Sequence, residues 1–441
     1  MVVFKQGVVK MLTKASLGKN MPASQKMKRL RKIEIIWWTC LIICFGIGIY
    51  SIISGYFLKG MSSTYLSNIV PWGGWVAFYI YFIGMSAGSF LLSTMIYGFG
   101  MEKYEKIGRS ALLSAIVCMI TAITFIFFDI GRPDHIMNSV IYWNVMSTMS
   151  WEIHFYIVYI LLLVTELYFS MRKDLIALAK NNNFKGKLYR FLTFNKQEFT
   201  GADQARDKKR LKIMGIIGIP LAIFGVHGGT GSIFAVAKAQ PYLNSGLFPL
   251  IFILSALVSG TALSIAIYVV KSKAQKQDLD VPMVRSLGSM LALFLGIEFI
   301  MVWYEFLIGI YGLGHEELGT IKLLTGSKWW WSFWIFQMGL AMLFPLIILF
   351  MKKTRQSVNW ILAASILTII GIVGVRFNMV VPTLIMPKLE GMPVGAYYPN
   401  LSEWLTTFGL IAMCLIIYTL GEKVFPIEEQ DSHERGVGNY E

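Results

Sequence analysis

The sequence predicts an all-α, polytopic membrane protein with about ten transmembrane helices. Of its 441 residues, 56% are hydrophobic and only 15% are charged, whereas a soluble domain carries about 25% charged residues. The apolar residues gather in about ten runs of roughly 17–25 residues, the length that a helix needs to cross about 30 Å of hydrocarbon. Connections rich in Lys and Arg alternate along the chain with connections that hold few of them. This alternation predicts which connections face the cytoplasm.

The runs divide the chain into a membrane domain, 33–421, with a basic tail at 1–32 and a second tail at 422–441. The first run is long enough to remain as a membrane span rather than a cleavable signal. The longest connection, 171–210, is hydrophilic and is expected to hold one short amphipathic helix near Leu175–Leu178. The expected spans are 33–57, 72–98, 110–128, 151–170, 211–236, 247–270, 287–311, 329–350, 359–380 and 403–421.

The basic residues predict that both termini are cytoplasmic. With that orientation, 33 of the 40 Lys and Arg residues lie on the cytoplasmic side and 6 lie outside, while Arg376 remains within a span. This asymmetry is what the positive-inside rule describes. It accounts for the net charge of +15 without a nucleic-acid partner, because the anionic lipid of the inner leaflet attracts such a surface.

Four cysteines, Cys40, Cys44, Cys118 and Cys414, all fall inside apolar runs and form no CxxC or CxxCH motif. The sequence therefore disfavours a disulfide framework, a structural metal site and a covalently attached cofactor.

Ionisable residues within the apolar runs converge on one depth, the outer third of the membrane. Each costs a few kcal/mol at the bilayer centre, so such residues indicate a functional site. Glu298 is expected to lie deeper and Glu166 near the inner end of its span. The outer group comprises Asp129, Arg132, Asp134, His135, Glu152, His154, His227, Glu305 and Arg376.

Helical spacing assigns some of these residues to common faces. Glu298 and Glu305 share one face, and Glu152 shares another with Tyr156 and Tyr159, whereas His154 points elsewhere. One interpretation is a polar pocket with carboxylates that pass protons. The other is a set of buried pairs, such as Arg376 with Glu305 or Asp129 with Arg132, that only hold helices together.

Two histidines at similar depth on consecutive spans, His154 and His227, leave a bis-histidine haem b open, although a hydrogen bond to a quinone head group suits both positions better. A secondary transporter is a further alternative, but such proteins bind substrate near the bilayer midplane.

Several motifs, in order and spacing, resemble the NrfD/PsrC family, and in particular its ten-helix branch, typified by the membrane subunit of hydrogenase-2-type complexes. The motifs are Pro71-Trp72-Gly73-Gly74, the segment 77–90 (AFYIYFIGMSAGSF), Asp129-Ile130-Gly131-Arg132-Pro133, Ser147 through Glu152, His227 through Ser232, and Tyr398 through Glu403. The similarity extends over nearly all of the sequence from the second span to the tenth.

The resemblance implies a quinone-interacting subunit of the bacterial inner membrane without a redox cofactor of its own. It implies menaquinone or ubiquinone as bound substrate at an outer-face site. It also implies two four-helix bundles, spans 2–5 and 6–9, and an outer partner: a four-cluster ferredoxin-like iron–sulfur subunit that is connected to a molybdenum or nickel catalytic subunit.

We therefore expect two sets of site residues. Quinone contacts are expected from Asp129, Arg132, His135, Glu152, His154 and His227. Proton transfer is expected from Glu166, Glu298, Glu305 and Arg376, and no metal ligands are expected.

Overall fold

The computed structural model describes residues 23–236, 242–275, 277–312, 315–326, 329–387 and 391–428; for 23–30 and 315–317 it describes the backbone only. Within these ranges all the regular secondary structure is helical, and no strand is formed. Ten of the described helices are long and apolar enough to cross a membrane. The predicted fold class, an all-α polytopic membrane protein, is confirmed.

The first half of the chain supplies five spans. Here α2 continues into the π-helix η2, and α8 continues through the π-helix η6 into α9. The elements are α2 (Ala23–Ser51), η2 (Ile52–Phe57), η3 (Gly60–Ser63), α3 (Gly74–Tyr97), η4 (Glu102–Tyr104), α4 (Glu105–Asp129), η5 (Pro133–His135), α5 (Asn138–Ile141), α6 (Thr148–Leu178), α7 (Phe184–Leu192), α8 (Gly201–Pro220), η6 (Leu221–His227) and α9 (Gly228–Ala235).

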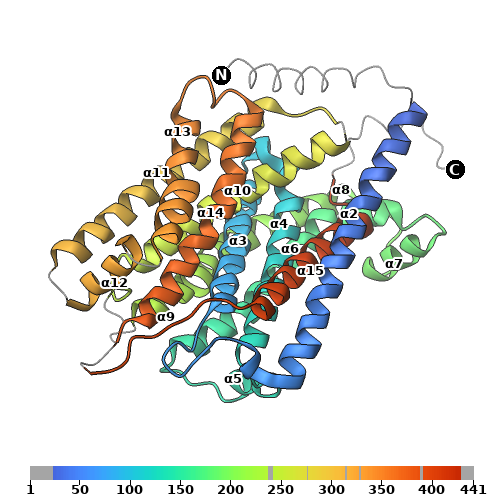
Figure 1. The fold of residues 1–441 in the computed structure, drawn as a ribbon. Helices are drawn as coiled ribbons and strands as arrows, with labels where there is room; N and C mark the ends of the chain where they lie inside the picture. Colours follow the sequence, from blue (N-terminus) through green and yellow to red (C-terminus); the bar gives the residue numbers. More distant parts are fainter. Residues whose placement is uncertain are drawn as a thin grey trace.

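The second half supplies the other five spans. Its elements are α10 (Phe248–Gln275), α11 (Val281–Tyr311), α12 (His315–Gly326), the π-helix η7 (Ser332–Leu343) with α13 (Phe344–Phe350), α14 (Val358–Ile385) and α15 (Leu401–Val424). Successive spans alternate in direction. One end of the assembly carries α5 and α12, and the other carries α7 (Figure 1). We call them the α5 end and the α7 end.

The structure corrects the predicted connection 171–210. Helix α6 extends to Leu178 and α8 begins at Gly201, so the residues expected to form a separate amphipathic helix, Leu175–Leu178, belong to α6. The short helix is instead α7, which begins after Asn183. Both long helices continue beyond their apolar stretches because ion pairs hold their charged ends, including Arg172 with Asp207 at 2.9 Å.

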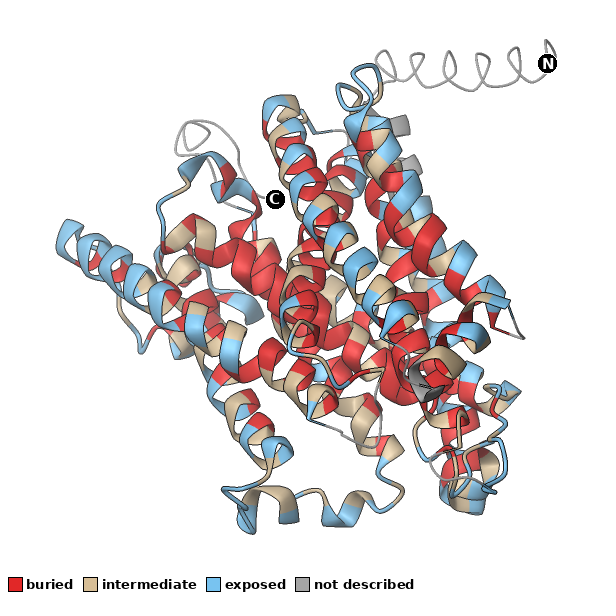
Figure 2. Cartoon of the chain, turned by 90° about the vertical axis from the view of Figure 1, so that its left-hand side faces the viewer, coloured by how far each residue is buried: buried red, intermediate tan, exposed pale blue. Residues whose placement is uncertain are grey.

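Helix α3 lies at the centre of the fold, and 89% of its apolar window is buried. It packs against α4 in the first bundle and against α10 and α14 in the second. Helix α2 packs along α15 at the periphery, with 22% of its window buried. Figure 2 shows the same division, with buried residues in the middle of the assembly and exposed residues around it.

The two bundles meet where α3 crosses α10. A Cβ atom on Gly88 would lie 1.7 Å from the Ala256 carbonyl oxygen, and one on Gly260 would lie 2.0 Å from the Gly88 carbonyl carbon. Only glycine permits this approach, as in the small-residue interfaces of membrane helices. We call this contact the α3–α10 seam. It places residues of the two bundles next to one another at the same depth.

Candidate functional site

A buried carboxylate near the start of α6 organises the candidate site. Glu152 is 2% exposed, and its Oε1 accepts a hydrogen bond from the Tyr156 hydroxyl at 2.5 Å. The Thr230 hydroxyl of α9 also donates to Oε1, and the Tyr79 hydroxyl of α3 donates to Oε2 at 3.4 Å. We call these four residues the Glu152 cluster. Its donors come from three helices, and no cation neutralises the carboxylate within it.

Local sequence explains why these groups meet. Tyr156 follows Glu152 by one turn of α6, so both face α3, and the Tyr79 and Tyr156 hydroxyls are 2.9 Å apart. Gly225 in the π-helix η6 lets α6 approach closely, since a Cβ on Gly225 would lie 2.8 Å from the Phe155 ring. The predicted face of Glu152 and Tyr156 is therefore present, and Tyr159 continues it towards the α7 end.

His227 lies beside this cluster, fully buried, at the last residue of the π-helix η6. π-Helical turns are frequent at functional sites because they shift side chains out of the regular register. The imidazole ring is centred 5.3 Å from the Phe252 ring. A Cβ on Gly84 would lie 3.4 Å from both His227 Cε1 and Arg376 Nη2, so Gly84 leaves the space in which these two side chains come together.

Arg376 extends the polar region into the second bundle. Its Nη2 donates to Ser255 Oγ at 2.8 Å, and its guanidinium lies over the Phe252 ring at 4.6 Å. Ser255 also contacts Glu298, which is the carboxylate facing Arg376. The predicted pair of Arg376 with Glu305 is thus replaced by Arg376 with Glu298.

Glu305 lies closer to the α5 end than Glu298, as the spacing predicted. It is half-buried and accepts a hydrogen bond from Ser245 at 3.1 Å. Glu166 is fully buried in the half of α6 nearer the α7 end, where Ser93 of α3 donates to it at 3.4 Å.

Asp129 belongs to a different group of residues. At the end of α4 it lies near Tyr56 and Glu403, and its Oδ1 is buried without a hydrogen-bond partner among the described residues. Glu403 accepts from the Tyr397 hydroxyl at 2.5 Å, and burial raises the pKa of the Tyr397 phenol, which keeps it a donor. This contact fastens the start of α15 to the α5 end.

The suggested pair of Asp129 with Arg132 does not form. Arg132 contacts Asp134 at 3.4 Å, and His135 contacts the same carboxylate at 3.2 Å; these side chains are exposed. The reason is local, since the turn at Gly131 (φ +73°) directs Arg132 away from the end of α4.

His154 lies at the edge of the site and is half-buried. Its Nδ1 is 2.7 Å from the Ser150 carbonyl oxygen, and its ring stacks on Trp143 with the centroids 4.5 Å apart. As predicted from its position on α6, it occupies a different face from Glu152.

Tyr79, Thr230 and Ser255 were not among the predicted site residues. Each carries an uncharged hydroxyl within an apolar run, so a search for ionisable groups passes over them. For Thr230, a usable signal was its position in the glycine-rich segment that follows His227.

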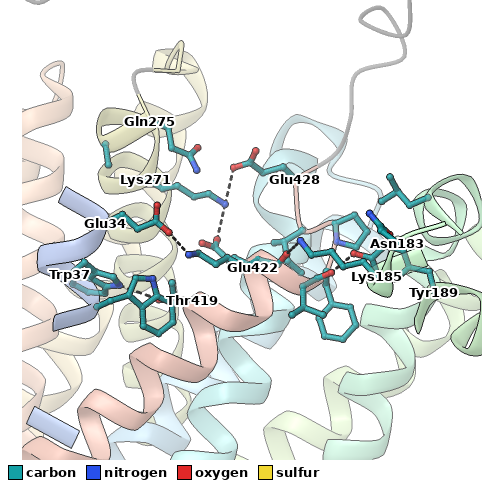
Figure 3. Close-up of a pocket in the computed structure, with 18 of the residues that line it drawn as sticks. Glu34, Trp37, Asn183, Lys185, Tyr189, Lys271, Gln275, Thr419, Glu422 and Glu428 are labelled. Atoms are coloured by element: carbon teal, nitrogen blue, oxygen red, sulfur yellow. Dashed lines mark hydrogen bonds and ion pairs between the residues drawn. The ribbon is translucent and has the colours of Figure 1, made fainter. Parts of the chain in front are cut away.

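A cavity of about 1380 Å³ lies far from these residues, at the α7 end (Figure 3). It is bordered by α2, α7, α10 and α15. Lys271 bridges Glu422 at 2.7 Å and Glu428 at 2.8 Å, and Lys423 pairs with Glu34. Because these two cations are already paired with carboxylates, we place the candidate site at the Glu152 cluster and not in this cavity.

Comparisons with known proteins agree over most of the sequence. This protein is 37% identical over 407 residues to the C subunit of the selenate reductase of Mesobacillus selenatarsenatis, and the match spans 88% of the sequence and 94% of that relative. It is 30% identical to the Hdr-like menaquinol oxidoreductase integral membrane subunit of Archaeoglobus fulgidus, over 84% and 89% of the two sequences. The integral membrane subunit of the menaquinone reductase of Nitratidesulfovibrio vulgaris is 24% identical, over 90% and 93%.

The match to a family model is equally broad. The model described as "Polysulphide reductase, NrfD" matches residues 62–388, which include every member of the Glu152 cluster together with His227, Arg376 and Glu298. This chain therefore belongs to the NrfD polysulphide reductase family of integral membrane subunits.

Proposed function

We propose that this protein is the integral membrane subunit of a respiratory oxidoreductase complex, in which it exchanges electrons between a membrane quinol and an iron–sulfur subunit. The observation that carries the proposal is the Glu152 cluster, a buried carboxylate held by hydroxyl groups from three helices. Two of the relatives reported above have menaquinol or menaquinone in their names, which favours menaquinol as the substrate.

Quinol oxidation releases two electrons and two protons, so the site needs a proton acceptor near the quinol hydroxyl. Glu152 can accept a proton, and its protonation would release the Tyr79 and Thr230 hydroxyls, which donate to the carboxylate, to donate to a quinone oxygen instead. His227 and His154 flank the cluster as further hydrogen-bonding groups. The electrons pass to the nearest iron–sulfur cluster of the partner.

The α5 end is proposed to face the outside and the iron–sulfur partner. The connection between α5 and α6 exposes large apolar side chains there, among them Tyr142, Val145 and Met146, the last 92% exposed. A contiguous exposed apolar surface outside the membrane favours docking of another protein. Asp129 ends α4, and Arg132 and His135 lie on the connection that follows it. These three residues are proposed to line the approach to the quinone site.

The remaining predicted residues are proposed to move or balance protons. Glu298 and Arg376 face each other next to His227, so the charge on one of them influences how readily the other gains or loses a proton. Glu305 lies nearer the α5 end, and Glu166 lies on the side of the α7 end.

The test is quinol-dependent electron transfer by the purified complex. Glu152→Gln is expected to lower the rate by about 100-fold or more, because an amide cannot accept the proton while it keeps the size of the side chain. His154→Ala is expected to reduce the rate in the same assay. Glu102→Gln serves as control, since Glu102 is exposed at the other end of the molecule. Wild-type rates in Glu152→Gln and His154→Ala would refute the placement of the site.

A further inference from the structure

Helix α7 and the turn after it carry exposed aromatic side chains at the edge of the assembly (Figure 1). Phe184, Phe191 and Phe194 are 83%, 79% and 90% exposed. Phe184 and Phe191 are two helical turns apart, so they share one side of α7, and Phe194 lies in the turn that follows. We call these three residues the phenylalanine face. Large apolar side chains gathered on a surface in this way mark a contact surface.

The opposite side of α7 is fastened to the membrane domain. Gly186 and Tyr189 are buried there, and the Tyr189 hydroxyl donates to the carbonyl oxygen of Val424. Lys185 Nζ donates to the carbonyl oxygen of Lys423 at 2.8 Å. Because Val424 is the last residue of the membrane span α15, these contacts hold α7 at the depth where that span ends, which is the membrane surface.

The turn after α7 holds Phe194 in a costly backbone conformation. Phe194 (φ +51°) and Asn195 (φ +58°) both lie in the left-handed region, and the other described residues with positive φ are glycines. A hydrogen bond of 2.8 Å from the Asn195 N–H to the Arg190 carbonyl oxygen maintains the turn. Glycine adopts this conformation without a steric penalty. The backbone therefore gives no reason for a phenylalanine here, and its exposed side chain does.

Basic side chains accompany the phenylalanine face, and acidic ones do not. Residues 175–197 include no Asp or Glu and five basic residues, namely Lys180, Lys185, Lys187, Arg190 and Lys196. Among the described residues, Lys196 is the one member of this group that pairs with a carboxylate, that of Asp203. Lys185 and Lys187 flank the phenylalanine face on its two sides. A surface that is both apolar and positive complements the head-group region of anionic lipid.

A hollow of about 300 Å³ lies at the C-terminal end of this surface. It is bordered by Arg190, Phe191, Phe194 and Asn195. A guanidinium group is well suited to bind a phosphate group, because its N–H donors match the phosphate oxygens. The two aromatic rings beside it provide an apolar wall for the start of an acyl chain.

We propose that α7 and the turn after it form a binding site for anionic phospholipid at the membrane surface of the α7 end. The phenylalanine face inserts among the acyl chains close to the head groups, while Lys180, Lys187 and Arg190 contact the phosphates. A soluble protein is the other candidate occupant. Lipid is favoured because the contacts with α15 place α7 at the membrane surface and because the surrounding charge is entirely positive.

The experiment measures the depth of α7 in a bilayer. The full-length protein in its complex, with the four native cysteines replaced, carries Phe191→Cys with a nitroxide label and is placed in nanodiscs of phosphatidylcholine with phosphatidylglycerol. Electron paramagnetic resonance gives the accessibility of the label to oxygen, which concentrates in the bilayer, and to a water-soluble nickel complex. We expect the ratio of oxygen to nickel accessibility to exceed several-fold the ratio at Glu198→Cys, a control position exposed on the same connection.

Two matched pairs of lysine variants test the role of charge. Lys180→Gln with Lys187→Gln is expected to lower the ratio at position 191, as is the omission of phosphatidylglycerol from the nanodiscs. Lys352→Gln with Lys353→Gln is expected to leave the ratio unchanged. These two control lysines are also exposed, but they lie between α13 and α14, away from α7.

A glycine variant separates the side chain of Phe194 from its backbone. Phe194→Gly relaxes the left-handed turn, so the unfolding temperature in detergent should not fall. Added phosphatidylglycerol should raise that temperature in the wild type and raise it less in Phe194→Gly, because the ligand stabilises only the form that binds it. A purely structural role for this phenylalanine would instead lower the unfolding temperature without added lipid and overturn its place in the site.

The label at position 191 also decides between the two occupants. Nickel accessibility equal to that at position 198 would overturn the proposal and point to a soluble protein as the partner. Equal ratios with and without phosphatidylglycerol would overturn the requirement for anionic lipid. None of these measurements depends on quinol turnover, so the proposed function and the lipid site stand or fall separately.

Discussion

Two buried carboxylates of α6, Glu152 and Glu166, are stabilised by hydroxyl groups. Glu152 has Tyr79, Tyr156 and Thr230, and Glu166 has Ser93. Neutral donors satisfy a carboxylate without fixing its charge, whereas a buried salt bridge would hold it ionised. A group that must gain and lose protons during turnover needs the first kind of environment.

Glu298 differs from these carboxylates because it faces a cation, Arg376. Removing that cation gives a test of stability at the residue scale. Arg376→Met leaves Glu298 buried without its cation, and removing one partner of a buried pair costs about 3–5 kcal/mol. We expect thermal unfolding in detergent at a clearly lower temperature. Adding Glu298→Gln should recover at least half of the loss. Arg132→Met is the control, because Arg132 is 72% exposed and should change stability by less than about 0.5 kcal/mol.

At the scale of elements, glycine positions decide how closely the helices approach. The α3–α10 seam depends on Gly88 of α3 and Gly260 of α10, each of which lies against the backbone of the other helix. Helix-breaking features are placed beside the site, where Pro220 precedes the π-helix that ends at His227. Irregular backbone of this kind is tolerated where protein surrounds it.

The α3–α10 seam predicts a sharp difference between two glycine substitutions. Gly88→Ala places a Cβ 1.7 Å from a backbone oxygen, so the helices must move apart. We expect a loss of at least about 1–3 kcal/mol, the usual cost of overpacking, and a lower yield of folded protein. Gly46→Ala on α2 meets nothing within 4 Å and should be neutral. Equal unfolding temperatures for the two variants would contradict the close contact.

At the scale of the whole molecule, charge is concentrated at the α7 end. The described ion pairs there include Arg109 with Asp174, Arg172 with Asp207, and Lys196 with Asp203 at 2.6 Å. The α5 end is instead rich in aromatic contacts, such as Trp329 stacked on Tyr398 at 4.7 Å. This asymmetry supports the proposal that the α7 end is cytoplasmic.

Cysteine labelling tests that orientation. Asn144 and Asn182 are exposed at the α5 and α7 ends, respectively. In a variant without the four native cysteines, Asn144→Cys should react with a membrane-impermeant maleimide on intact cells. Asn182→Cys should react only after the membrane is permeabilised. The reverse labelling pattern would invert the proposed topology and move the quinone site to the cytoplasmic side.

The spans, and the presence of Glu152, His227 and Arg376 inside them, could be predicted from the sequence. Placing a charged residue within a membrane span costs free energy whatever the arrangement of the other spans, so such a residue can be recognised from the sequence alone. The pairings could not be predicted in this way. Arg376 faces Glu298 and not Glu305, and Asp129 lies with Tyr56 and Glu403 and not with Arg132.

By itself, the sequence determined that this protein crosses a membrane about ten times and carries ionisable groups within its spans, because hydropathy and length are local properties. Only the tertiary structure decided which groups meet. Contacts such as Tyr79 with Glu152 and Ser93 with Glu166 join residues 73 positions apart. They depend on how the two helices are rotated relative to each other. That rotation is set by packing against all the neighbouring helices, and no local sequence pattern encodes it.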